Sequence, residues 1–157
     1  MNSNQLYDIT LFIRNEVKRF TKDKQSINNE TLCGACAIAS VALHDSLRQL
    51  HVQSIIVEGS FESTWNFASH CWVETTKYVL DPTATQFNEF RRSTWPDVLV
   101  IDRQKFFKIR TLPKFYEIKK GQDAIEHLTQ WWTPQNFQTY CHEIHSCVNK
   151  CVKKFSS

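Results

Sequence analysis

The stretch from Thr31 to Leu50, TLCGACAIASVALHDSLRQL, constrains the fold of this chain more than any other. Its apolar residues recur at three- and four-residue intervals, which predicts a helix with one apolar face. Alanine and leucine favour helices, and no proline interrupts the run. We expect the helix to begin within Cys33–Cys36, where Gly34 loosens the chain. The apolar face comprises Ala35, Ala39, Ala42, Leu43, Leu47 and Leu50.

The start of this helix gives Cys36 a distinctive environment. Amide N–H groups in the first turn have no partner inside the helix, and they carry the positive end of the helix dipole. A thiol placed there has a lowered pKa and a larger thiolate fraction, and the thiolate is the nucleophilic form. Cys36 is therefore a candidate for covalent catalysis if a histidine can reach it.

A predicted β-hairpin downstream supplies that histidine. The alternation over His70–Glu74 predicts a strand, and the bulky residues 78–80 predict a second strand that ends at Asp81 before a proline. A turn about Thr75–Thr76 sets residue 74 opposite 77 and His70 opposite Asp81, with their side chains as close neighbours. An aspartate beside an imidazole fixes its tautomer and stabilises the imidazolium.

Together these motifs resemble the transglutaminase-like superfamily of cysteine enzymes, which have a papain-like Cys-His-Asp core. The motifs are G-x-C opening a helix, H-x-W on a strand and D-P-T ending the next strand, all within about residues 30–90. The resemblance implies an α+β fold. A nucleophile helix is expected to pack on a small antiparallel sheet, with N- and C-terminal helices covering the rest.

The resemblance also implies roles for the three residues: Cys36 as nucleophile, His70 as base and Asp81 as the group that orients the histidine. The implied activity is acyl transfer from an amide through a thioester on Cys36, of the peptidase, amidase or glutamine deamidase/transglutaminase type. The implied substrate is a protein or peptide, and no cofactor is expected.

The polar segment 21–30 predicts a loop before the nucleophile helix. In transglutaminase-like and papain-like enzymes this region provides a second oxyanion donor, and papain-like enzymes use a glutamine. Here the sixth residue before Cys36 is Glu30, an acceptor when ionised and so unsuited to that role. The candidates for oxyanion donor or support are Gln25, Asn28, Asn29 and Cys33.

Two tryptophans near His70 are candidates for a substrate groove. Trp65 lies in an aromatic connector and either floors such a groove or caps the core. Trp72 shares the strand face of His70, so we expect it to border the site by packing against the imidazole or shielding it from water.

The run Cys33-Gly34-Ala35-Cys36 fits other classes as well. It is close to the C-G-[SA]-C signature of papain-type proteases, but there the histidine follows more than a hundred residues later, and here the gap is 34. It could form a thioredoxin-like redox pair of Cys33 and Cys36, or half of a zinc site completed by Cys147 and Cys151. The fold could also serve as a non-catalytic protein-binding module.

Composition and charge bear on the number of domains, the class of partner and the compartment that we expect for this chain. At 157 residues, with 41% apolar and 13% aromatic residues, we expect a single domain spanning 1–157. A net charge of +3 gives no reason to expect nucleic acid or a membrane as partner. The absence of a signal-like apolar segment predicts a cytoplasmic protein with free thiols, or one delivered to a target cell by a route that needs no signal peptide. The oligomeric state stays open, and no metal is expected.

The rest of the chain predicts further helices and strands. An amphipathic helix over residues 5–20 points Arg14, Lys18 and Arg19 to solvent. A helical turn is expected after Asp81. The other expected strands are Gln53–Glu58, Asp97–Asp102, Phe106–Ile109 and Phe115–Ile118, and the other expected helices are Gln122–Trp132 and Pro134–Phe155.

Overall fold

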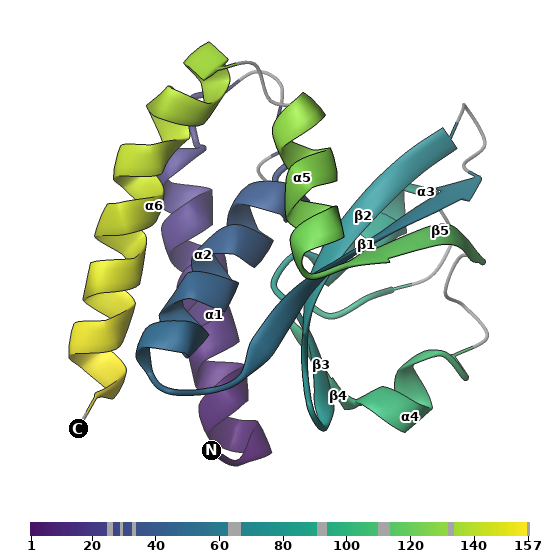
Figure 1. Cartoon of the computed structure of the whole chain (residues 1–157), viewed down its shortest axis with the longest axis horizontal. Coiled ribbons are helices and arrows are strands. Elements are labelled where there is room, and N and C mark those ends of the chain that lie inside the picture. Colours follow the sequence, from purple (N-terminus) through teal and green to yellow (C-terminus); the bar gives the residue numbers. More distant parts are fainter. Residues whose placement is uncertain are drawn as a thin grey trace.

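A five-stranded antiparallel sheet forms the centre of the fold (Figure 1). The computed structural model describes residues 1–24, 27–28, 30–32, 34–62, 67–90, 94–109, 114–131 and 134–156. The strands are β1 (Ser54–Glu62), β2 (Phe67–Thr75), β3 (Tyr78–Asp81), β4 (Leu99–Asp102) and β5 (Phe115–Lys120), in the order β4-β3-β2-β1-β5. β2 is therefore the middle strand, with β1 and β3 on its two sides.

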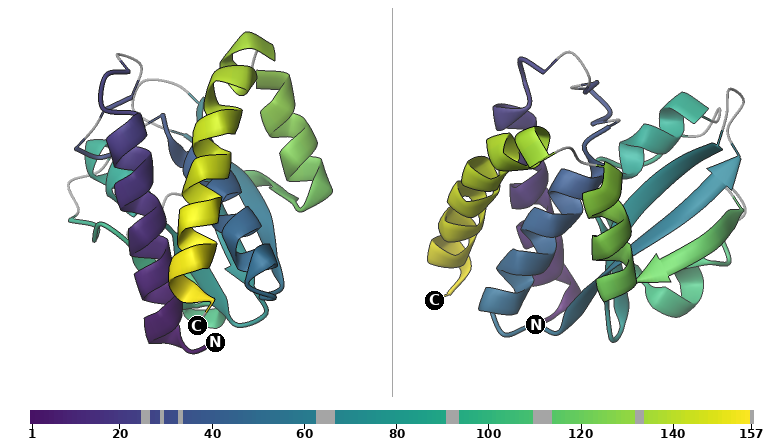
Figure 2. Two further views of the ribbon diagram at one scale, coloured as in Figure 1. Left: turned by 90° about the vertical axis from the view of Figure 1, so that its left-hand side faces the viewer. Right: turned by 45° about the horizontal axis from the view of Figure 1, so that its top comes forward.

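Three helices lie on one face of this sheet, two against the strands and the third packed on these two from outside (Figures 1 and 2). They are α1 (Ser3–Phe20), α2 (Cys36–Gln49) and α6 (Pro134–Phe155), and α2 contacts both β1 and β2. Their apolar stripes meet in one buried cluster that also receives Val73 and Leu80 from the sheet. The helix α5 (Gln122–Trp131) follows β5 and contacts β1 and β5.

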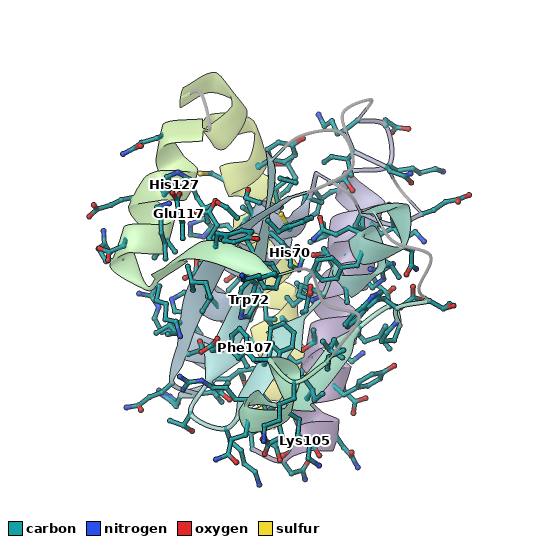
Figure 3. The ribbon with its side chains drawn as sticks, turned by 90° about the vertical axis from the view of Figure 1, so that its right-hand side faces the viewer. His70, Trp72, Lys105, Phe107, Glu117 and His127 are labelled. Atoms are coloured by element: carbon teal, nitrogen blue, oxygen red, sulfur yellow. The ribbon has the colours of Figure 1, made fainter. Side chains whose placement is uncertain are left out.

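The other face of the sheet carries a second, aromatic cluster (Figure 3). Trp72 and Val79 point to this face, because side chains alternate along a strand. The short elements η1 (Ala84–Gln86), α3 (Phe87–Phe90) and α4 (Arg103–Phe106) cover it. The sheet thus separates an aliphatic core under the helices from an aromatic core under the short elements.

The α+β class expected from the sequence is confirmed, and most predicted elements exist close to their predicted bounds. The strand predicted over Phe106–Ile109 is wrong, because Asp102 accepts a hydrogen bond from the N–H of Gln104 and caps the helical turn α4. That turn carries Phe106 into the aromatic core, 5.6 Å from the ring of Trp72. No helix in the described ranges has both the length and the apolar character to cross a bilayer.

Candidate active site

Cys36 is the first residue of α2, as the sequence predicts. Two residues just before it adopt left-handed backbone conformations, Leu32 with φ of 58° and Gly34 with φ of 89°. Glycine takes this conformation readily, but for leucine it costs roughly 1–2 kcal/mol. Burial of Leu32 in the aliphatic core helps to offset that cost. The N-cap residue Ala35 provides no side-chain cap, so the first N–H groups of α2 keep their hydrogen-bonding capacity for another acceptor.

The pairing of β2 with β3 differs from the predicted register by two residues. Val73 pairs with Leu80 and Glu74 pairs with Val79. The predicted pairing of residue 74 with 77, and of His70 with Asp81, is therefore wrong. The reason lies in the turn, where the Thr75 hydroxyl accepts hydrogen bonds from the N–H groups of Lys77 and Tyr78 at 3.4 and 2.9 Å. These bonds centre the turn one residue later, on Thr76 and Lys77.

His70 and Asp81 meet in spite of the shifted register. A shift of two residues leaves every side chain on its original face, because the side-chain period of a strand is two. The two residues become diagonal neighbours, which long side chains can bridge. His70 Nε2 lies 2.6 Å from Asp81 Oδ2, and both side chains are completely buried. Asp81 Oδ1 accepts from the N–H of Thr83 at 2.8 Å and from its hydroxyl at 3.2 Å, so the carboxylate is held at both oxygens.

Aromatic rings enclose the imidazole of His70 and exclude water from it. The ring of Phe87 meets it edge-on with centroids 4.5 Å apart, and Trp72 stacks beside it at 6.0 Å. The side-chain amide of Gln86 lies 3.3 Å from Nε2. Trp72 therefore packs against the imidazole, but it is 0% exposed and cannot border an open groove as the sequence analysis expected. Its indole N–H donates to Glu74 at 3.2 Å instead.

The second ring nitrogen of His70 has a different environment from Nε2. Nδ1 is buried and has no hydrogen-bond partner among the described residues. Burial disfavours the charged ring, but the Asp81 carboxylate, through its charge and its hydrogen bond, and the charge of Cys36 outweigh that effect and raise the pKa of His70. These effects together favour the imidazolium form of His70.

Cys36 is biased in the opposite direction. A hydrogen bond from the thiol of Cys71 lowers the pKa of Cys36 most, and burial opposes it. The positive charge of His70 and the backbone N–H of Cys71 add to the lowering, Asp81 opposes it, and the net pKa is about 6. The pKa of Cys71 is raised well above 9, first by its hydrogen bond to Cys36 and then by burial. The two shifts therefore favour the thiolate at Cys36 and the neutral thiol at Cys71.

Cys36 begins the helix α2, which packs on the strand that carries His70 and Cys71. His70 and Cys71 are consecutive on β2, so their side chains point to opposite faces of the sheet. Backbone N–H groups lie in the plane of the sheet, and the Cys36 sulfur accepts from that of Cys71. Among the described residues β3 pairs with β2 only at Val73 and Glu74.

Arg14 joins the segments that carry the site. The sequence pattern placed it in solvent, but its side chain is 2% exposed and points into the protein. Its guanidinium donates to the carbonyl oxygens of Pro82 at 2.9 Å and Glu30 at 3.3 Å, and to Asp97 at 3.0 Å. Buried arginine is tolerated when its N–H groups find acceptors, and three distant segments provide them here. Arg14 thereby ties the loop before α2 to the residue after Asp81.

Other residues proposed from the sequence have different positions. Asn28 is exposed, and its side-chain oxygen accepts from the N–H groups of Glu30 and Thr31, which stabilises the turn before α2. The remaining candidates, Gln25, Asn29, Cys33 and Trp65, lie outside the described residues. Within the described ranges, no three His, Cys, Asp or Glu side chains gather closely enough to hold a metal ion.

No protein-family model, curated protein or solved structure matches this chain. The geometry of the chain's own residues is therefore the basis for inferring which reaction the site can catalyse. Cys71, Gln86 and Arg14 are parts of this geometry that sequence reasoning missed. Around His70 and Asp81 the sequence offered only the H-x-W and D-P-T motifs as signals of function. Neither motif says what Cys71, the residue between His70 and Trp72, contacts.

Proposed function

We propose that this protein is a cysteine-dependent acyltransferase or hydrolase that attacks an amide through a thioester on Cys36, as transglutaminase-like enzymes do. The observation that supports this most is the placement of a half-buried, low-pKa thiol at a helix start beside a histidine bonded to a buried aspartate. A nucleophile, a base and an orienting group in this order are the requirements of covalent acyl transfer.

The proposed reaction uses each group at a defined atom. The Cys36 thiolate attacks the amide carbonyl, and free N–H groups at the start of α2 stabilise the oxyanion. Nδ1 of His70 donates its proton to the leaving amine, because Nε2 is engaged by Asp81. Water or a second amine then attacks the thioester, and the neutral imidazole takes a proton from it. The first outcome is hydrolysis and the second is transfer.

The proposed substrate class is a protein or peptide that presents an amide, either a peptide bond or a glutamine side chain. The resemblance of the G-x-C, H-x-W and D-P-T motifs to the transglutaminase-like superfamily supports this class. A redox function for Cys33 and Cys36 is the alternative, and Cys33 lies outside the described residues.

Mass spectrometry of a glutamine-rich acceptor protein such as casein tests this proposal. Incubation with the enzyme, with and without a primary amine, distinguishes peptide cleavage, conversion of glutamine to glutamate, and attachment of the amine. Cys36→Ala should abolish all three. Cys147→Ala is the matched control, because this α6 thiol is buried and its pKa is raised to about 12, chiefly by burial.

If casein is not modified, a second measurement shows whether casein is the wrong substrate or the acyl-transfer proposal is wrong. Iodoacetamide should alkylate Cys36 near pH 6.5 much faster than Cys147 or Cys151, because only thiolates react appreciably. If Cys36 is no more reactive than these two thiols, the acyl-transfer proposal is wrong, and a non-catalytic protein-binding module becomes the better description.

A further inference from the structure

Three residues of one short segment contact the imidazole of His70. Asp81, which ends β3, lies with its Oδ2 atom 2.6 Å from His70 Nε2. The ring of Phe87, the first residue of α3, meets the imidazole edge-on with centroids 4.5 Å apart. The side-chain amide of Gln86, the last residue of η1, lies 3.3 Å from the same Nε2. Gln86 is 3% exposed, so its amide is buried beside the ring, and the proposed reaction gives it no role.

Hydrogen bonds within this segment hold Gln86 in place. Thr83 donates to Asp81 Oδ1 from both its N–H and its hydroxyl, and the N–H of Gln86 donates to the carbonyl oxygen of Thr83 at 3.0 Å. The hydroxyl of Thr85 donates to the carbonyl oxygen of Thr31 at 2.8 Å, which ties this turn to the loop before α2. The backbone of Gln86 is therefore fixed relative to Asp81 and to the start of α2.

The hydrogen on Nε2 decides which atom of the Gln86 amide can bond to it. A ring nitrogen carries at most one hydrogen, and the 2.6 Å distance to the carboxylate of Asp81 requires that Nε2 carries it. The amide nitrogen of Gln86 lies at 3.3 Å, but two N–H groups cannot form a hydrogen bond with each other. A half-turn of the amide brings Oε1 to nearly the same place, and this oxygen can accept.

We propose that Gln86 is a positioning residue for His70, with its Oε1 atom accepting the hydrogen of Nε2 jointly with Asp81. Two acceptors at Nε2 fix the tautomer of the ring, and this is the tautomer that the proposed reaction requires. Gln86 carries no charge, so it adds an acceptor without a second negative charge that would oppose the thiolate form of Cys36. The effect of Gln86 on turnover rests on the proposed acyl transfer, but its hydrogen bond to His70 does not.

This arrangement predicts the direction in which Gln86 acts on the ring. An oxygen that accepts from the Nε2–H group favours the imidazolium, because hydrogen bonds from a charged donor are stronger. An amide N–H that faced the ring would favour the neutral form instead. Asp81 is charged and lies closer, so Gln86 makes the smaller contribution in the same direction. The titratable groups whose charge acts on His70 are Asp81 of β3 and Cys36 of α2, and the test leaves both unchanged.

The test follows the ring nitrogens of His70 by NMR across a pH titration of the full chain, with isotopically labelled histidine. The chain has six histidines, and the signals that are lost in His70→Asn are those of His70. In the wild type, the neutral ring should carry its hydrogen on Nε2. Gln86→Met keeps the length of the side chain and removes the acceptor, so the pKa of His70 should fall. Gln104→Met is the matched control, because Gln104 is exposed and its replacement should leave the pKa of His70 unchanged.

A neutral wild-type ring with its hydrogen on Nδ1 overturns the inference, and this reading needs no variant to fold. A pKa of His70 that rises or stays the same in Gln86→Met overturns it too, because the amide then donates to the ring or does not act on it. Gln86→Glu keeps an oxygen beside Nε2, so an equal fall in this variant would assign the effect to altered packing.

None of these measurements needs turnover, so the positioning role and the acyl transfer can fail independently. If the acyl transfer is correct, Gln86→Met should also lower kcat with little change in KM.

Discussion

Replacing Cys71 with alanine isolates the hydrogen bond that most lowers the pKa of Cys36. The substitution removes the S–H donor and leaves the backbone N–H of residue 71 in place. Hydrogen bonds to charged groups contribute about 1.5–3 kcal/mol, and a thiol is a weak donor, so a value of about 1–2 kcal/mol is reasonable. At 1.36 kcal/mol per pKa unit, the pKa of Cys36 should rise by about one unit.

The assay is alkylation of Cys36 by iodoacetamide as a function of pH, read by mass spectrometry of the modified peptide. The midpoint should move from about 6 to about 7. At pH 6.5 the thiolate fraction then falls from roughly three quarters to roughly one quarter. The midpoint is a better measure than the rate at one pH, because a thiolate of higher pKa is also intrinsically more nucleophilic.

Cys71→Ser is the matched control, because the hydroxyl keeps a donor at nearly the same place. Its midpoint should stay within a few tenths of a unit of the wild-type value. An unchanged midpoint in Cys71→Ala would refute the assignment of the hydrogen bond as the main cause. Equal shifts in the alanine and serine variants would point to altered packing of α2 on β2 instead.

Three further predictions concern the groups around this sulfur. Asp81→Asn should lower turnover by up to about 10⁴-fold with little change in substrate binding, as the equivalent change does in serine proteases. Steady-state kinetics measure both quantities, and a raised KM with unchanged kcat would contradict this role of Asp81. Turnover should follow a bell-shaped pH profile. It should rise through about pH 6 as Cys36 ionises, and fall above pH 6.5 as His70, whose pKa is raised, loses its proton. A profile without the fall at alkaline pH argues against the imidazolium of His70 as the acid. Arg14→Met should lower the free energy of unfolding by about 1–3 kcal/mol, because it leaves the buried carbonyl group of Pro82 unpaired, and Arg14→Lys should recover part of this in urea titrations. A loss below half a kilocalorie in Arg14→Met would show that water replaces the guanidinium without cost.

Local patterns in the sequence were sufficient for most of the elements, for the helix-start position of Cys36 and for the meeting of His70 with Asp81. The three-to-four-residue spacing of apolar residues placed α1, α2 and α6 close to their observed bounds, and it placed Cys36 at a helix start. The two-residue period of strands put His70 and Asp81 on one face. That prediction survived an error of two residues in the register, because such a shift preserves the face.

Contacts between distant segments were decided only by the tertiary structure. Cys71 follows His70 on the strand and points to the other face, so no local pattern relates it to Cys36; the packing of α2 on β2 does so. Arg14 reads as a solvated charge within a polar helix face. It is buried because carbonyl groups far along the chain, at residues 30 and 82, accept its hydrogen bonds. Periodicity records which side of an element is apolar, but the partner of a polar group depends on where the remaining elements pack.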